Sequence, residues 1–201
     1  LYGNYEIGDE KENITTSSPK AIVKIDGSTI TKDNKILGYL DLEESKILNL
    51  INGKLKETII KMNYYDGYII FEPNRIKVSR ELDIKNNIIK INISGYSKTK
   101  EIQSNIDLKD PKEVKKLNKA LNMELEKKIT DTFNSIREKY GTDVFGFQEL
   151  YYRTNYKYFK KNCTNWYEDI YPKIKLEVKA NVRLYEKGST LGGLRYERKN
   201  K

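Results

Sequence analysis

The chain has 201 residues, of which 37% are hydrophobic and 33% are charged, and its formal net charge is +9. It contains no histidine, and Cys163 is its one cysteine, which excludes His-based catalytic triads, His-ligated zinc and a disulfide within the chain. No apolar run approaches the roughly 20 residues that a membrane-spanning helix needs. The sequence begins with Leu1, and we expect it to be an internal or C-terminal part of a longer protein.

Alternating apolar residues predict a mostly antiparallel sheet. Ile89, Ile91 and Ile93 alternate with polar residues, which is the pattern of a sheet with one face in water. Pro73 has no N–H group for a strand ladder, so we expect an edge position or a bend there. The predicted strands cover residues 21–25, 28–31, 35–40, 55–62, 68–82, 88–96, 97–106 and 173–187.

Two helices have clear end signals. The first follows Asp41, which forms a capping-box spacing with Glu44, and it ends before Gly53, a residue suited to a left-handed C-terminal position. The second covers 111–140 after the cap residue Asp110, with apolar residues every three or four positions. We expect this long amphipathic helix to pack against the sheet, which gives an α+β fold with shorter helices.

The composition along the chain predicts one main domain. Residues 1–19 are polar and rich in turn formers, and we interpret them as a linker or as the end of a preceding domain. Residues 20–190 form a single α+β domain in this interpretation. Residues 191–201 are predicted to be a flexible tail.

Residues 138–166 crowd aromatic side chains among basic ones. We interpret most of them as a helical core stripe with a helix break at Thr154 and Asn155, and not as a nucleic-acid platform. The stripe consists of Tyr152, Tyr156, Phe159, Cys163, Trp166 and Ile170. Tyr151, Tyr158 and Tyr167 fall off this stripe, so they are the candidates for a contact surface.

Carboxylates are the remaining candidates for catalysis. Asp41, Glu43 and Glu44 are close in sequence, and a pair of carboxyl groups can carry out glycan hydrolysis, but a helix cap already explains Asp41 and Glu44. Asp143 is interpreted as a turn or cap residue. We therefore predict no enzyme activity, no metal and no cofactor. Two alternatives stay open: a Lys-rich binding module for anionic lipid headgroups or polymers, and, more weakly, a carboxylate-based glycan hydrolase.

Several motifs in one order resemble the Ger(x)C family, the C subunits of spore germinant receptors. Residues 27–56 are similar to a segment of the family that starts with a glycine and continues with the pattern Lys-apolar-apolar-Gly-aromatic-Leu-Asp. The sequence "TDVFGF" (142–147) is similar to the family's "ADIFGFG" box. The likeness covers about residues 20–190, and departs from the family at 155–156, where the family favours proline. The signature positions, to which we assign structural roles, are Gly27, Gly38, Asp41, Glu44, Gly53, Asp143, Phe145, Gly146, Phe147, Trp166 and Pro172.

The resemblance implies a non-enzymatic lipoprotein subunit of a nutrient germinant receptor. Such a subunit works with an integral-membrane A subunit and a transporter-like B subunit at the outer face of the spore inner membrane. Its lipid anchor would be a cysteine upstream of Leu1. The resemblance implies action by protein–protein contact, with no catalytic residues, no cofactor and no nucleic-acid partner.

Overall fold

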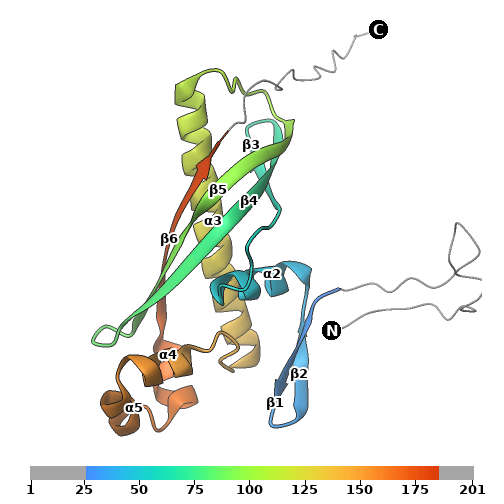
Figure 1. Cartoon of the computed structure of the whole chain (residues 1–201). Coiled ribbons are helices and arrows are strands. Elements are labelled where there is room, and N and C mark those ends of the chain that lie inside the picture. The colour runs from blue at the N-terminus through green and yellow to red at the C-terminus, as the bar shows by residue number, and fades with distance from the viewer. Residues whose placement is uncertain (1–25, 186–201) are drawn as a thin grey trace, which may run out of the picture.

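The computed structural model describes residues 26–185 (Figure 1). The predicted lead-in over 1–19, the predicted strand over 21–25 and the predicted tail over 191–201 lie outside the described residues. The domain boundaries therefore stay predictions.

A four-stranded sheet and one long helix form the main body (Figure 1). The strands, in their order across the sheet, are β3 (Ile60–Tyr64), β4 (Gly67–Asp83), β5 (Ile88–Gln103) and β6 (Lys175–Leu184). The pairs β3–β4 and β4–β5 are antiparallel, and β6 runs parallel to β5. Helix α3 (Pro111–Tyr140) packs its apolar stripe against the sheet. The predicted α+β class, with a mostly antiparallel sheet against a long amphipathic helix, is confirmed.

Helix α3 has the bounds that its end signals predict. The Asp110 carboxylate accepts a hydrogen bond from the Lys112 N–H at 2.9 Å, and Gly141 ends the helix with φ 57°. The side chains of the predicted stripe that are buried are Leu117, Leu121, Leu125, Ile129, Phe133 and Ile136. Ile89, Ile91 and Ile93 of β5 lie in the same core, so their predicted alternation is confirmed as well.

A hairpin and a short helix precede the main sheet. Strands β1 (Ser28–Lys32) and β2 (Lys35–Leu40) form a separate two-stranded sheet, and α2 (Leu42–Ile51) follows. The predicted capping box is confirmed: the Glu44 N–H donates to Asp41 Oδ1 at 2.8 Å, and the Asp41 N–H donates to Glu44 Oε2 at 3.0 Å. Gly53 has φ 67°, in the left-handed region expected for it.

The strand predictions differ from the structure at several boundaries, two of which change the interpretation. Strand β5 is continuous over the predicted boundary at 96–97, because β4 pairs with it along both halves. The predicted strand over 55–62 begins only at Ile60. The predicted bend near Pro73 is present, since the register between β4 and β5 shifts between Asn74 and Lys77.

Four short helical segments connect α3 to β6 and lie together at one end of the sheet (Figure 1). They are α4 (Phe147–Thr154), α5 (Tyr156–Asn162), a π-helical turn (Trp166–Ile170) and a 3-10 turn (Tyr171–Lys173). The predicted helix break is confirmed, because Asn155 separates α4 from α5 and its side chain accepts a hydrogen bond from the Tyr158 N–H at 3.0 Å. Within residues 26–185, none of the helices combines the length and the apolar character needed to cross a bilayer.

Candidate functional site

The segment after α3 is a buried phenylalanine junction. Phe133, Phe145 and Phe147 form a triangle with ring centroids 5.4–5.7 Å apart, a spacing at which aromatic pairs attract beyond their burial. Gly146 has φ 69°, which turns the chain between two buried rings. The Arg80 guanidinium of β4 donates to the Phe145 carbonyl at 2.9 Å, which ties the junction to the sheet. Phe145 and Phe147 therefore serve the core and offer no contact surface.

Asp143 organises the start of α4. Its Oδ2 accepts a hydrogen bond from the Gln148 N–H at 2.6 Å, which is the turn or cap role predicted for it. Burial raises the pKa of the Asp143 carboxyl, while backbone N–H groups close to it act in the opposite direction. The pKa of Asp143 is therefore shifted because this capping residue lies in a buried part of the chain.

The tyrosine predictions need a correction. Tyr151, proposed as a contact residue, is only 1% exposed. Its hydroxyl donates to Asn87 Oδ1, and its ring meets the buried Trp166 edge to face at 5.0 Å between centroids. Burial raises the pKa of the Tyr151 hydroxyl. Tyr151 is a core residue.

The prediction that the aromatic stripe is buried is also wrong at its first two positions. Tyr152 and Tyr156 are 49% and 51% exposed, and their rings pack against each other at 5.2 Å. The error has a physical cause, because the break at Asn155 changes the rotational phase between α4 and α5 and one periodic stripe cannot run through both. Cys163 and Trp166 are buried as predicted.

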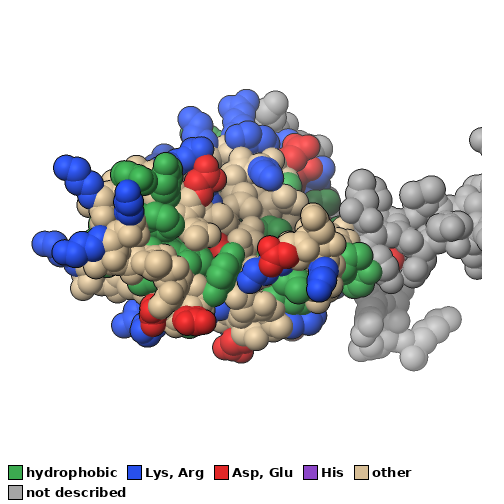
Figure 2. Space-filling model, turned by 90° about the horizontal axis from the view of Figure 1, so that it is seen from below, with side chains coloured by type: hydrophobic (Ala, Val, Ile, Leu, Met, Phe, Trp, Pro, Cys, Tyr) green, Lys and Arg blue, Asp and Glu red, His purple; other side chains and the backbone are tan. Residues whose placement is uncertain are grey.

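Exposed tyrosines and lysines occur together on α4 and α5. We name Tyr152, Tyr156, Lys157, Lys160 and Lys161 the tyrosine–lysine surface; all five are exposed. Figure 2 views the molecule from this end and shows Lys and Arg side chains standing around hydrophobic ones. Of the other contact candidates, Tyr158 is half-buried and Tyr167 is 37% exposed, with the Lys32 amine 4.0 Å above its ring centroid.

A second exposed apolar group lies on strand β2 of the hairpin and at the first residue of α2. Its side chains are 42–60% exposed, and we name them the hairpin patch: Ile36, Leu37, Tyr39 and Leu42. We did not predict this group from the sequence. The signal was present in "KILGYL", since apolar residues follow one another on both faces of a strand that has a single hydrogen-bonded neighbour in the described part of the chain.

Gly38 fixes how the hairpin sits on α3. A Cβ at this position would lie 2.5 Å from the Tyr140 ring. The Tyr140 hydroxyl donates to the Tyr39 carbonyl at 2.7 Å, so ring and strand need this close approach. Gly27 has a similar role, because a Cβ there would lie 1.8 Å from the Leu40 carbonyl oxygen.

The carboxylates close in sequence are engaged in helix structure. Asp41 and Glu44 bond each other's backbone N–H groups, and Glu43 pairs with Lys46 at 2.5 Å. Between residues 26 and 185, no group of three or more Cys, Asp or Glu side chains is placed to hold a metal ion.

A family model matches residues 26–188 of the chain and is described as "Spore germination B3/ GerAC like, C-terminal". The chain belongs to this family. The resemblance to the C subunits of spore germinant receptors is confirmed, and with it the assignment to the C-terminal region.

Two relatives in Bacillus agree with this assignment. Spore germination protein KC of Bacillus subtilis (strain 168) is 27% identical over 196 residues, which cover 92% of this chain and 48% of the relative. Spore germination protein GerQC of Bacillus cereus is 25% identical over 174 residues, covering 84% of this chain and 47% of the relative. The chain therefore spans about half the length of the curated relatives it matches.

A solved structure shares the fold of this GerAC-like domain. The crystal structure of the GerBC protein matches with a TM-score of 0.71 at 19% sequence identity, over 92% of this chain and 56% of that one. At this identity the match concerns the fold alone.

Several of the positions that we expect to be family signatures lie at points of structural constraint. Gly27, Gly38 and Gly146 permit close approach or a turn, and Trp166 is buried against Tyr151. Pro172 differs from these, since it is exposed in the 3-10 turn before β6.

Proposed function

We propose that this chain is part of the non-catalytic C subunit of a nutrient germinant receptor. It acts by protein–protein contact at the outer face of the spore inner membrane, beside the integral-membrane A and B subunits. Membership of the GerAC-like family supports the receptor assignment. A lipid anchor outside the matched region belongs to the same proposal.

The hairpin patch is the observation that supports protein contact. Contiguous exposed apolar surface marks interaction sites, whereas single scattered apolar side chains are ordinary. The four side chains of the hairpin patch lie within seven residues of one another. Ile36 and Leu37 are exposed, and the two-stranded hairpin that carries them lies at the side of the main body (Figure 1). We assign this patch to contact with another receptor subunit.

The double substitution Ile36→Ser and Leu37→Ser tests this assignment in the full-length protein. We expect the variant to fold with unchanged thermal stability and to lose co-purification with the A and B subunits from detergent-solubilised spore membranes. The control is Ile59→Ser, which changes another exposed apolar residue (56% exposed) outside the patch. Co-purification of the double variant at the wild-type level would remove the hairpin patch from the proposal.

A gene deletion tests the receptor assignment separately. Spores that lack this protein should form normally and fail to germinate with at least one nutrient, and expression from a plasmid should restore that response. Normal germination with every nutrient tested, in a strain without other germinant receptors, would contradict the assignment.

We infer a non-enzymatic role from the positions of the carboxylates. A glycan hydrolase needs two carboxyl groups across a scissile bond, about 5–10 Å apart, whereas Asp41, Glu43 and Glu44 are held at the start of α2. Wild-type protein incubated with cell-wall glycan should release no reducing ends. Release that disappears in the variant Glu43→Gln and Glu44→Gln would restore the hydrolase alternative.

The tyrosine–lysine surface favours a second candidate, binding to anionic lipid headgroups. Lysine side chains are attracted to an anionic leaflet. Tyrosine side chains favour the depth of the lipid headgroups, where the ring is in an apolar environment and the hydroxyl contacts water. Lys157, Lys160 and Lys161 are exposed on one helix, next to Tyr152 and Tyr156.

Co-sedimentation with phosphatidylglycerol vesicles tests this candidate. Binding at low salt should fall steeply as salt is raised to a moderate concentration, and should be lost in the variant Lys157→Glu, Lys160→Glu and Lys161→Glu. The control reverses the same number of exposed lysines elsewhere, with Lys54→Glu, Lys56→Glu and Lys127→Glu. Equal loss in both variants would mean attraction by overall charge, without a defined surface.

A further inference from the structure

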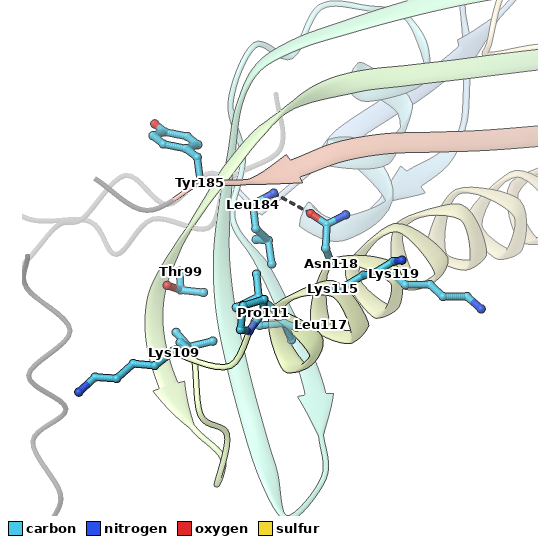
Figure 3. Close-up of a pocket in the computed structure, with 11 residues that line it drawn as sticks. Thr99, Lys109, Pro111, Lys115, Leu117, Asn118, Lys119, Leu184 and Tyr185 are labelled. Atoms are coloured by element: carbon cyan, nitrogen blue, oxygen red, sulfur yellow. Dashed lines mark hydrogen bonds between the residues drawn. The ribbon is translucent and has the colours of Figure 1, made fainter. Parts of the chain in front are cut away.

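A pocket opens where α3 begins, at the opposite end of the domain from the tyrosine–lysine surface (Figures 1 and 3). Its volume is about 740 Å³, within the range of about 300–1,000 Å³ that small-molecule sites occupy. Its apolar lining comes from the loop before α3, the first turns of α3 and the end of β6. These residues are Leu108, Pro111, Val114, Leu117, Leu184 and Tyr185.

The walls of the pocket are fixed to each other. The Leu184 N–H of β6 donates to Asn118 Oδ1 of α3 at 2.7 Å (Figure 3). Leu117, on the adjacent position of α3, is fully buried and belongs to the core. Helix and strand are therefore held at a set spacing, and the pocket is formed before any ligand binds.

The polar residues of the lining give the pocket a positive edge. Lys109, Lys115 and Lys119 are exposed, and none of the described lining residues is acidic. Lys109 and Lys119 extend outward on opposite sides in Figure 3. Such side chains can cover an apolar surface with their methylene groups while the amines stay in water.

Acidic side chains near the pocket are bonded to groups of their own segment. The carboxylates of Asp107 and Asp110 accept the N–H groups of Lys109 and Lys112, each at 2.9 Å. Glu113 pairs with Lys116 at 2.7 Å. These carboxylates keep their negative charge, but none of them belongs to the described lining of the pocket, whereas the three lysines of its edge do.

We propose that this pocket binds an anionic amphiphile with a single acyl chain, such as a fatty acid or a lysophospholipid. The acyl chain lies between Val114 and Leu184, and the positive edge that Lys109, Lys115 and Lys119 form around the pocket attracts the carboxylate or phosphate. An anionic ligand fits the charge of the pocket edge better than the chain's own C-terminal segment would, because residues 186–201 contain five Lys or Arg and two Glu and are therefore basic. An anionic headgroup complements the lysine edge, whereas a basic segment does not.

Titration of the full chain with dodecanoate below its micelle concentration, followed by calorimetry, tests the proposal. We expect saturable binding at one molecule per chain, and no saturable binding of dodecyltrimethylammonium, which has the same chain length and a positive head. The variant Lys109→Glu, Lys115→Glu and Lys119→Glu should bind dodecanoate about tenfold or more weakly, as expected for three exposed charge contacts. The matched control, Lys54→Glu, Lys56→Glu and Lys127→Glu, reverses three exposed lysines outside the pocket and should bind as the wild type does.

A second variant tests the apolar part. Val114→Trp fills the space beside the first turn of α3, and should abolish dodecanoate binding while circular dichroism and thermal stability stay at wild-type values. If this variant does not fold, Tyr185→Glu, which places a negative charge at the pocket edge, takes its place with the same expected loss. Phosphatidylglycerol vesicles distinguish the two sources of such a ligand: competition with dodecanoate indicates a bilayer lipid, and its absence indicates a free amphiphile.

Three results would overturn the proposal. They are the absence of saturable dodecanoate binding, equal weakening in the two lysine variants, and binding of an acidic leucine-containing peptide in the pocket without any binding of dodecanoate. The last would identify a protein partner as the occupant.

Discussion

Tyr151 shows how one hydroxyl can join separate segments at the residue scale. It donates to Asn87 Oδ1, and the Asn87 amide in turn donates to the Ile170 carbonyl at 3.2 Å. The turn between β4 and β5 is thereby tied to α4 and to the π-helical turn.

The substitution Tyr151→Phe should lower the free energy of unfolding by about 1–2 kcal/mol, because Asn87 Oδ1 is left without its donor. The matched change Tyr152→Phe, on an exposed ring, should alter it by less than about 0.5 kcal/mol. Urea unfolding followed by circular dichroism measures both. Equal values for the two variants would mean that the Tyr151 hydroxyl contributes nothing beyond its ring.

Buried tyrosines also predict how stability depends on alkaline pH. Burial raises the pKa of Tyr151 and of Tyr171, whereas an unfolded tyrosine titrates at about 10. Above that pH the unfolded state loses protons that the folded state keeps, so the unfolded state binds fewer protons and the free energy of unfolding falls. The contribution of the buried tyrosines to the free energy of unfolding is complete below about pH 10 and is lost as the pH rises through their pKa in the folded state.

We expect urea midpoints that decline above about pH 10, with a shallower decline in Tyr151→Phe than in wild type. Tyr152→Phe should decline as wild type does, since Tyr152 is exposed. Parallel declines in all three proteins would show that Tyr151 titrates alike in the folded and unfolded states.

At the scale of elements, α3 both fills the core and covers the outer edge of β6. Its side chains accept hydrogen bonds from alternate β6 residues at 2.7–2.8 Å: Asn118 from Leu184, Asn122 from Val182 and Glu126 from Ala180. These backbone groups are on the side of β6 away from β5. Side chains four residues apart on a helix thus occupy an edge that would otherwise be open to another strand.

Replacing Asn122 with alanine should lower the free energy of unfolding by about 1–3 kcal/mol, because Asn122 bonds both the N–H and the carbonyl of Val182. The control Glu124→Ala removes a side chain of the same helix whose ion pair with Lys128 is long, at 3.8 Å. Its effect should stay below about 0.5 kcal/mol. Equal effects in the two variants would assign the stability of α3 to its apolar stripe alone.

The sequence predicted those elements whose signals are local. The bounds of α3 follow from Asp110, Gly141 and a stripe within one continuous helix. The faces of α4 and α5 could not be predicted in the same way, because their relative rotation depends on the turn at Asn155 and on packing against Trp166. The bonds of Asn122 to β6 were equally inaccessible, since a polar residue beside an apolar stripe indicates solvent unless the facing strand is known.

At the scale of the whole molecule, the described residues combine one large core with a small hairpin at its side (Figure 1). Strand β5 has neighbours on both sides, β4 and β6, whereas β1 and β2 have only each other in the described part of the chain. An isolated two-stranded hairpin is marginally stable in water. Ile30 and Leu40 anchor this one, since both are buried.

Amide hydrogen exchange should reveal this difference. We expect β1 and β2 to exchange at least about tenfold faster than β5, by local opening at a lower free energy than global unfolding. If the hairpin patch contacts another receptor subunit, adding the solubilised A and B subunits should slow exchange in β2 and leave β5 unchanged. If β2 exchanges as slowly as β5 in the isolated chain, the hairpin belongs to the same cooperative unit as the main sheet. The hairpin patch would then be a rigid surface and not a segment that binding stabilises.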